Sequence, residues 1–152
     1  MKIQISTDYA IRVLLFLHEN RDGGGLYTAM DIAEAVGVTY PFFIKIAGQL
    51  KKAGLIEAVQ GRHGGYQLGM PACEISLYNV FLAIEGELQI NRCLKGVKEC
   101  SHITLHGCKL RSFFCRLQEQ ITASMSGIVI SDLIHTSVFA TDKTTEELSC
   151  AG

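Results

Sequence analysis

The sequence predicts a mainly α-helical protein with one small β-hairpin, built as a winged helix-turn-helix domain followed by a long amphipathic helix. Three observations predict it. Two short helical patterns meet at Gly37, a glycine-rich turn at 60–65 is flanked by short β-type runs, and an apolar helical period runs through 109–126. The 152 residues suit one such domain with an added oligomerisation segment, and the 48% hydrophobic content supports a packed core.

The first two predicted helices are bounded by capping residues. Ser6 offers a hydroxyl N-cap, and Asp8 places an acid in the first turn of the first helix. The second helix follows a glycine-containing loop. Thr28 is its expected N-cap, and Gly37 ends it at the position where a left-handed residue usually sits.

A third helix and a hairpin complete the winged-helix pattern. The helix, 41–52, begins after Thr39 with Pro41 in its first turn, and both residue types favour a helix start. Within 55–68, two β-type runs flank the basic, glycine-rich turn at 60–65, which predicts a hairpin. A hairpin directly after a helix-turn-helix is the wing of a winged helix.

Such a fold binds DNA with its second helix-turn-helix helix in the major groove and its wing at the backbone or minor groove. The net charge is −1, so attraction to nucleic acid has to be local, and four cations face one acid, Glu57, between residues 40 and 70. Lys51 and Lys52 also fit a plain solvated helix end, which is the commoner role of such residues. The candidate DNA-binding residues are Thr39, Tyr40, Pro41, Lys45, Lys51, Arg62 and His63.

The rest of the chain predicts a short helix, a long loop and a long amphipathic helix. Ser76 starts the short helix, Leu77–Glu85, which Gly86 stops. Residues 87–109 show no helical or strand period, and a loop this long in a compact chain is usually functional. The helix Lys109–Ser126 has an apolar face too large for the small winged helix to cover, so we expect it to dimerise. Its apolar repeat is Leu110, Phe114, Leu117, Ile121, Met125 and Ile128.

These elements divide the chain into three predicted parts. Residues 1–76 form the DNA-binding domain, and 77–140 hold the cysteine loop and the dimerisation helix, with one more helical turn at 131–134. Residues 141–152 form a polar, acidic, flexible tail. Neither a signal-peptide pattern nor a membrane-spanning apolar run is visible, so we expect a cytoplasmic protein without a membrane partner.

Cysteines are concentrated in the loop and the helix that follows it. Cys93, Cys100, Cys108 and Cys115 are separated by six, seven and six residues. A cytoplasmic protein keeps thiols reduced, which favours metal or redox chemistry over disulfides. Thiolates on a wrapping loop suit an iron–sulfur cluster, whereas structural zinc generally uses a closely spaced pair that this chain lacks. Ordinary buried thiols are the other interpretation, above all for Cys115.

Five motifs occur along the chain in a fixed order: STDYA at 6–10, LKKAGLI at 50–56, GRHGGYQL at 61–68, ISL at 75–77 and AIEG at 83–86. Through them, over about residues 1–135, the chain resembles the Rrf2 family of winged-helix transcription regulators, which includes IscR, NsrR, RirA and CymR. The resemblance implies a homodimer with crossed long helices on a pseudo-palindromic operator in double-stranded DNA. In the sensing branches it implies an iron–sulfur cluster (2Fe–2S or 4Fe–4S) ligated by Cys93, Cys100 and Cys108.

The resemblance leaves the fourth cluster ligand open. In one branch it is an aspartate of the partner's first helix, at the position of Asp8 here, and in another it is a histidine, which points to His106. Members similar to CymR lack the cluster and act through protein partners. The sequence also departs from the family pattern. The gaps between the cysteines are slightly wider than the five residues usual in the family. Gln60 stands where family members often have an arginine before the wing glycine, and Ile44 stands where the family has a polar residue that reads a base.

We therefore expect a DNA-binding regulator, of the repressor type, that senses nitric oxide, redox state or iron and cluster supply. The cluster can be absent from purified protein. The alternative is a cluster-free thiol-redox or partner-controlled regulator of the same fold, and a remote alternative is an iron–sulfur electron or cluster carrier. We do not expect an enzyme, because the sequence has neither a phosphate-binding glycine loop nor a nucleophile–base pair.

Overall fold

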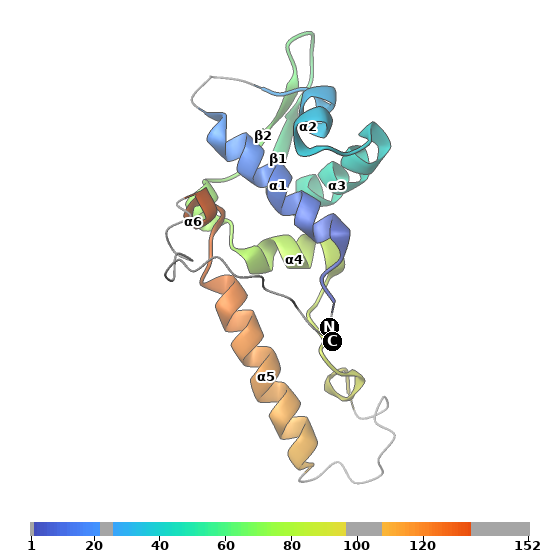
Figure 1. Cartoon of the computed structure of the whole chain (residues 1–152), viewed down its shortest axis with the longest axis vertical. Coiled ribbons are helices and arrows are strands. Elements are labelled where there is room, and N and C mark those ends of the chain that lie inside the picture. Colours follow the sequence, from blue (N-terminus) through green and yellow to red (C-terminus); the bar gives the residue numbers. More distant parts are fainter. Residues whose placement is uncertain (1, 22–25, 97–107, 135–152) are drawn as a thin grey trace, which may run out of the picture.

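The computed structural model describes residues 2–21, 26–96 and 108–134, which form a winged-helix head with one long helix projecting from it (Figure 1). The elements in order are α1 (Ile5–Glu19), α2 (Ala29–Val36), α3 (Tyr40–Lys52), β1 (Ile56–Val59), β2 (Gly65–Leu68), the 3-10 turn η2 (Ala72–Glu74), α4 (Leu77–Glu85), the 3-10 turn η3 (Arg92–Leu94), α5 (Lys109–Ser126) and α6 (Ile130–Ile134). The predicted fold class, mainly α with one hairpin, is confirmed.

The helix-turn-helix is formed by α2 and α3, with the end signals that the sequence predicts. The Thr28 hydroxyl accepts a hydrogen bond from the Asp31 N–H at 3.2 Å, while the Asp31 carboxylate accepts from the Thr28 N–H at 3.0 Å. This capping box satisfies two backbone donors. Gly37 ends α2 with φ of 74°, a left-handed conformation that costs a residue with a Cβ more than it costs glycine.

The wing is an antiparallel hairpin in which Ile56 pairs with Leu68 and Val59 pairs with Gly65. Tyr27, which precedes α2, adds one bridge to the outer side of β2. Its N–H donates to the Tyr66 carbonyl at 3.2 Å, and the Tyr66 N–H donates to the Tyr27 carbonyl at 2.8 Å. The hairpin is thereby tied to the start of the helix-turn-helix.

The core lies between α1, α2, α3 and the hairpin. Phe43 of α3 is fully buried and meets Tyr66 of β2 edge to face, with ring centroids 5.3 Å apart. The buried face of α3 consists of Phe43, Ile46, Ala47 and Leu50. Residues of α4 and α6 also contribute to the core, and its other large, fully buried hydrophobic side chains are Val13, Leu14, Ile32, Ile46, Leu50, Ile56, Ile75, Val80 and Ile130.

The predicted start of α1 is wrong. Ser6 does not cap this helix, which begins at Ile5 with Gln4 as its N-cap residue and no side-chain capping bond from it. The cap comes from another element, because the Glu85 carboxylate at the end of α4 accepts from the Gln4 N–H at 2.9 Å and from the hydroxyl of Thr7, which is 2% exposed. The Glu85 carboxylate, from a distant part of the chain, therefore caps α1 in place of the predicted Ser6 hydroxyl.

The chain returns to the head after α5. The Leu77 N–H donates to the Ile128 carbonyl and the Ile130 N–H donates to the Ile75 carbonyl, each at 2.9 Å. Ile130 is fully buried, and α6 packs against α1 (Figure 1). The extra helical turn predicted at 131–134 is confirmed.

Part of the predicted loop at 87–109 has structure. Residues 92–94 form η3, whose first turn is capped by the Asn91 side chain accepting from the Cys93 N–H at 3.2 Å, so the prediction that this whole segment is without helix is wrong. A single turn that is held by a side-chain cap is too short to produce a periodic apolar pattern in the sequence. The predicted tail at 141–152 lies outside the described residues, and the three-part division of the chain stays a prediction. Within the described ranges, no helix has the length and apolar character needed to cross a membrane.

Candidate functional site

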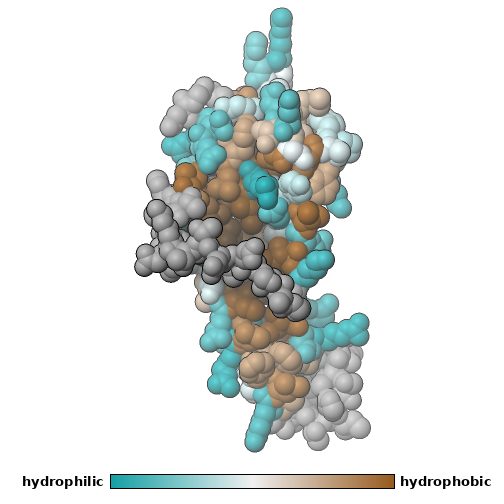
Figure 2. Space-filling model, in the orientation of Figure 1, coloured by the Kyte–Doolittle hydropathy of each residue, from teal (hydrophilic) through white to brown (hydrophobic). Residues whose placement is uncertain are grey.

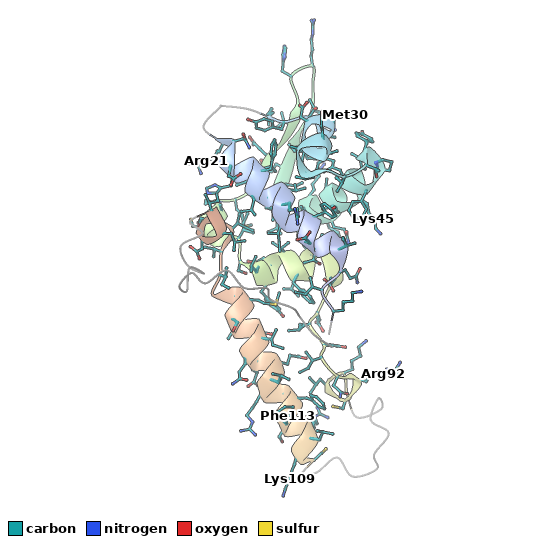
Figure 3. The ribbon with its side chains drawn as sticks, viewed as in Figure 1. Arg21, Met30, Lys45, Arg92, Lys109 and Phe113 are labelled. Carbon is teal, nitrogen blue, oxygen red and sulfur yellow. The ribbon has the colours of Figure 1, made fainter. Side chains whose placement is uncertain are left out.

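The outer face of α3 is the first candidate site. Its inner face is buried in the core, and the residues predicted to contact DNA lie on the opposite, exposed side. Tyr40 is 47% exposed, and Lys45 points away from the body of the head (Figure 3). The complete set of exposed residues on the helix is Tyr40, Pro41, Ile44, Lys45, Gly48, Lys51 and Lys52.

The electrostatic character of this face is cationic. The sequence of α3 contains three lysines and no acid. Lys51 and Lys52 lie in the last turn, where they also favour the helix dipole, so their presence has a structural explanation beside the functional one. Lys45 lies in the middle of the helix and has no such explanation. Thr39 is the N-cap residue, but its side chain makes no capping hydrogen bond.

The wing tip is the second part of the candidate DNA surface. Arg62 and His63 are both exposed, in the turn between β1 and β2 that the Gly64 N–H closes on the Gly61 carbonyl at 3.0 Å. Figure 1 places this hairpin at the far end of the molecule from α5, beside the helix-turn-helix. The residues predicted from sequence as DNA contacts are therefore all solvent-accessible on one domain.

The second candidate site is the cysteine segment, which carries Cys93 and Cys108. Cys93 lies in η3, and Cys108 is the N-cap residue of α5 with no side-chain capping bond. Both thiols are free and half-buried, like Cys115. The turn η3 packs against α5, and the Ile90 N–H donates to the Gln118 side chain at 3.3 Å. The segment that holds Cys93 is thus anchored on the helix that Cys108 begins.

The donor set fits an iron–sulfur cluster in its chemistry. Cys93 and Cys108 offer sulfur ligands of the kind that hold such clusters. Cys100 and His106 lie outside the described residues. Among the described residues there is no group of three or more His, Cys, Asp or Glu side chains that could hold a metal ion. The structure thus describes two of the three cysteines that are predicted to ligate the cluster.

Asp8, the candidate fourth ligand, is exposed on the first turns of α1. Its carboxylate pairs with the Arg12 guanidinium, with Nε and Oδ2 2.9 Å apart, and Arg12 also lies over the Tyr9 ring at 5.5 Å from its centroid. Both partners are more than half exposed, so the pair contributes at most about 1 kcal/mol and does not prevent Asp8 from taking another partner. Asp8 also lines an open hollow of about 710 Å³ together with Ile3 and Ile5.

Two residues that the sequence did not single out lie at these candidate sites. Glu85 holds the start of α1, directly beside Asp8, and no sequence pattern connects residues 78 positions apart. Gly48 lies on the exposed face of α3 where no packing constraint requires glycine. Its signal was visible in the sequence as a glycine inside a helical pattern, at a spacing of four from Ile44.

The chain is similar to known regulators over most of its length. The family model Rrf2, described as "Iron-dependent Transcriptional regulator", matches residues 3–136. "Protein aau3" of Rhizobium meliloti (strain 1021) is 33% identical over 135 residues, which are 88% of this chain and 85% of that protein. The solved structure of T. potens IscR covers 95% of this chain and 94% of its own at 21% identity, with a TM-score of 0.67. That of CymR (YrzC), the global cysteine regulator of B. subtilis, covers 90% and 98% at 19% identity, with a TM-score of 0.70.

Proposed function

The chain belongs to the Rrf2 family of transcriptional regulators, and from this premise we propose that it is a homodimeric repressor whose operator affinity depends on an iron–sulfur cluster. Members of this family are DNA-binding regulators, not enzymes. The observation that carries the DNA-binding part of the proposal is the cationic, acid-free outer face of α3 beside a basic wing tip. That arrangement fits the grooves and phosphates of double-stranded DNA.

In the proposed complex α3 lies in the major groove and the wing reaches the adjacent backbone or minor groove. In this proposal Lys45, in the middle of α3, contacts a base edge or phosphate, and Tyr40 and Pro41 of the N-terminal turn enter the groove first. Arg62 and His63 supply the wing contacts. Because phosphate contacts release counterions, the affinity should fall steeply as salt concentration rises.

The proposed dimer uses α5. This helix has 18 residues and none is buried, while Leu110 is 60% and Phe113 is 51% exposed. Figure 2 shows apolar residues gathered over α5 at the lower end of the molecule. Packing that face against a second copy removes it from water, at about 1.5–3 kcal/mol for each large side chain fully buried. A two-fold dimer of this kind presents two copies of α3, which suits a pseudo-palindromic operator.

The proposed sensor consists of Cys93, Cys100 and Cys108, with Asp8 of the partner or His106 as fourth ligand. An iron–sulfur cluster held there would supply reactivity toward nitric oxide, oxygen and iron shortage. The residues of the chain then couple the ligands to the rest of the fold: Gln118 anchors the segment before Cys93 on α5, and Cys108 is the first residue before that helix. Order in the loop is thereby linked to the position of α5, which sets the spacing of the two heads.

DNA binding is tested by selecting duplexes from a random-sequence library and measuring fluorescence anisotropy against salt concentration. Lys45→Ala and Arg62→Ala should weaken binding and lower the slope of log K against log salt by about one for each phosphate interaction that the substitution removes. Arg21→Ala is the matched control, because Arg21 lies on the opposite side of the head from Lys45 (Figure 3). Selection of no sequence, or equal losses of affinity in all three variants, would refute DNA binding by this face.

The cluster is tested by visible absorption with iron and sulfide analysis on protein purified without oxygen. A brown protein with matching iron and sulfide is expected, and Cys100→Ala should remove both the colour and the response of DNA binding to nitric oxide. Cys73→Ala is the control, because Cys73 is an exposed thiol in η2. A Cys100→Ala protein that keeps colour and response would show that the ligands are assigned wrongly.

A second candidate function is a regulator of the same fold without a cluster, controlled by thiol oxidation or by a protein partner. It is favoured by the free, half-buried thiols of Cys93 and Cys108 and by the fold shared with CymR. A thiolate can oxidise to a sulfenic acid or a disulfide, and reductant reverses both. Iron-free protein whose operator affinity falls with peroxide and returns with reductant would select this function over the cluster sensor.

A further inference from the structure

The outer face of α3 carries an apolar stripe that neither the core nor the cationic character of the helix explains. Tyr40, Ile44 and Gly48 follow one another at a spacing of four residues, which places them along one line of the helix. Tyr40 is 47% exposed and Ile44 is 38% exposed. Lys45 lies beside the stripe and Lys51 beyond its end, and the helix carries no acid.

Ile44 is the centre of this stripe. The core takes Phe43 and Ile46 from the same helix and leaves Ile44 partly exposed. An isoleucine side chain has no donor or acceptor, so on a surface that binds DNA it cannot hydrogen-bond to a base edge or a phosphate. The role open to it there is contact with an apolar group. In the major groove of unmodified DNA the apolar group at a base edge is the 5-methyl of thymine.

Gly48 extends the stripe with bare backbone. A Cβ at this position would meet no heavy atom within 4 Å, and the residue has no left-handed backbone angle that would require glycine. Glycine in the interior of a helix costs about 0.5–1 kcal/mol relative to alanine. The fold therefore does not explain the glycine, whereas the close approach of another molecule to the helix backbone does.

We propose that the stripe Tyr40–Ile44–Gly48 is the base-reading surface of this protein and that it packs on thymine 5-methyl groups in each operator half-site. The proposal rests on the function proposed above and states which bases the recognition helix reads. Ile44 contacts the methyl group, Tyr40 flanks it with its ring, and Gly48 lets α3 lie close to the floor of the groove. The surrounding lysines hold the phosphates and carry little sequence information.

The experiment uses the full-length protein and the highest-affinity duplex selected from a random library. Each thymine of the half-site is replaced by deoxyuridine, which removes the methyl group and leaves every hydrogen-bonding atom in place. At the contacted thymine this should weaken binding by about fourfold per half-site, the value expected for one methyl-sized group buried from water. In Ile44→Ala the same replacement should have no effect, because the thymine methyl group then has no apolar partner on α3.

Leu82→Ala is the matched control for Ile44→Ala. Leu82 is 37% exposed, close to the 38% of Ile44, and it lies on α4 and not on the recognition helix. The control should bind the selected duplex as the unmodified protein does and keep the full deoxyuridine effect. Ile44→Ala itself should bind about tenfold more weakly, the usual loss for one specific base contact.

Gly48→Ala gives an independent test with two readouts of opposite sign. The midpoint of thermal unfolding should rise, because alanine is the better helix former. Affinity for the selected duplex should fall at least tenfold, because the added methyl group holds α3 away from the groove. A Gly48→Ala protein that binds as tightly as the unmodified one would overturn the close approach.

The outcomes separate this inference from the function on which it rests. Selection of a defined duplex with the same deoxyuridine effect in the unmodified protein and in Ile44→Ala, or with no thymine in the half-site, refutes the thymine contact and leaves the regulator intact. Failure to select any duplex refutes DNA binding and the inference with it. Loss of the deoxyuridine effect in Ile44→Ala but not in Leu82→Ala supports it.

Discussion

The link between the end of α4 and the start of α1 gives a prediction whose size follows from the structure. Glu85→Ala removes the acceptor of the Gln4 N–H and of the Thr7 hydroxyl. Thr7 is 2% exposed in the intact chain, and a buried hydroxyl that loses its partner costs about 1–3 kcal/mol. Loss of the negative charge at the start of α1 adds about 0.3–1 kcal/mol.

Glu85→Ala should therefore lower the free energy of unfolding by about 2–3 kcal/mol, measured by urea denaturation at one fixed protein concentration. For a protein of this size, such a loss of unfolding free energy corresponds to a fall of roughly 5–10 °C in the melting temperature. Glu34→Ala is the control, because Glu34 is an exposed acid whose carboxylate makes no hydrogen bond among the described residues, and its effect should stay within about 0.5 kcal/mol.

A double-mutant cycle decides whether the buried hydroxyl is the cause. Thr7→Val replaces the hydroxyl with a methyl group of similar size, so Thr7→Val with Glu85→Ala leaves no buried hydroxyl without a partner, and the exposed Gln4 N–H can bind water in both variants. The double variant should be more stable than Glu85→Ala alone, with a coupling energy of at least about 1 kcal/mol. Additive losses in the double variant would refute the reasoning and assign the effect of Glu85 to its charge or its packing.

Two further predictions concern the dimer and the helix-turn-helix. Leu117→Asp, in the middle of the apolar face of α5, should convert a dimer to a monomer with a mass near 16.7 kDa by light scattering, while Ser112→Asp, on the opposite and exposed side of the helix, should leave the dimer intact. A dimeric Leu117→Asp protein would place the interface elsewhere. Thr28→Ala breaks the capping box of α2 and should cost about 1 kcal/mol of stability in urea denaturation, and a loss below about 0.3 kcal/mol would mean that water caps α2 equally well.

The elements that the sequence predicted well are those whose signals are local. The Thr28 cap, the Gly37 end and the glycine-rich wing turn all depend on residues within a few positions of one another, and α5 shows its period over 18 residues. The start of α1 was missed because its cap, Glu85, is 78 positions from Thr7. The sequence around Ser6 does not reveal that Glu85, far along the chain, caps the helix instead.

The same distinction applies to the candidate sites. The cationic residues of α3 and the wing are exposed, as the helical and hairpin patterns predicted. When the apolar face of an amphipathic element is buried, its opposite face is left exposed to solvent. The cysteine spacing predicted a ligand set, and the structure adds what spacing could not provide: Cys93 lies in a turn that packs against α5, and Cys108 is the N-cap of that helix. The gaps between cysteines say nothing about which helix anchors them.

The contacts around the end of α4 connect the two candidate sites by hydrogen bonds. The Gln49 side chain of α3 donates to the Ile84 carbonyl at 3.2 Å, and the next residue, Glu85, holds the start of α1 beside Asp8. Two residues of α4 therefore join the recognition helix to the helix that carries the candidate fourth ligand. The cysteine segment continues directly from this point. Under the function proposed above, we expect a displacement of that segment to reach α3 through these hydrogen bonds.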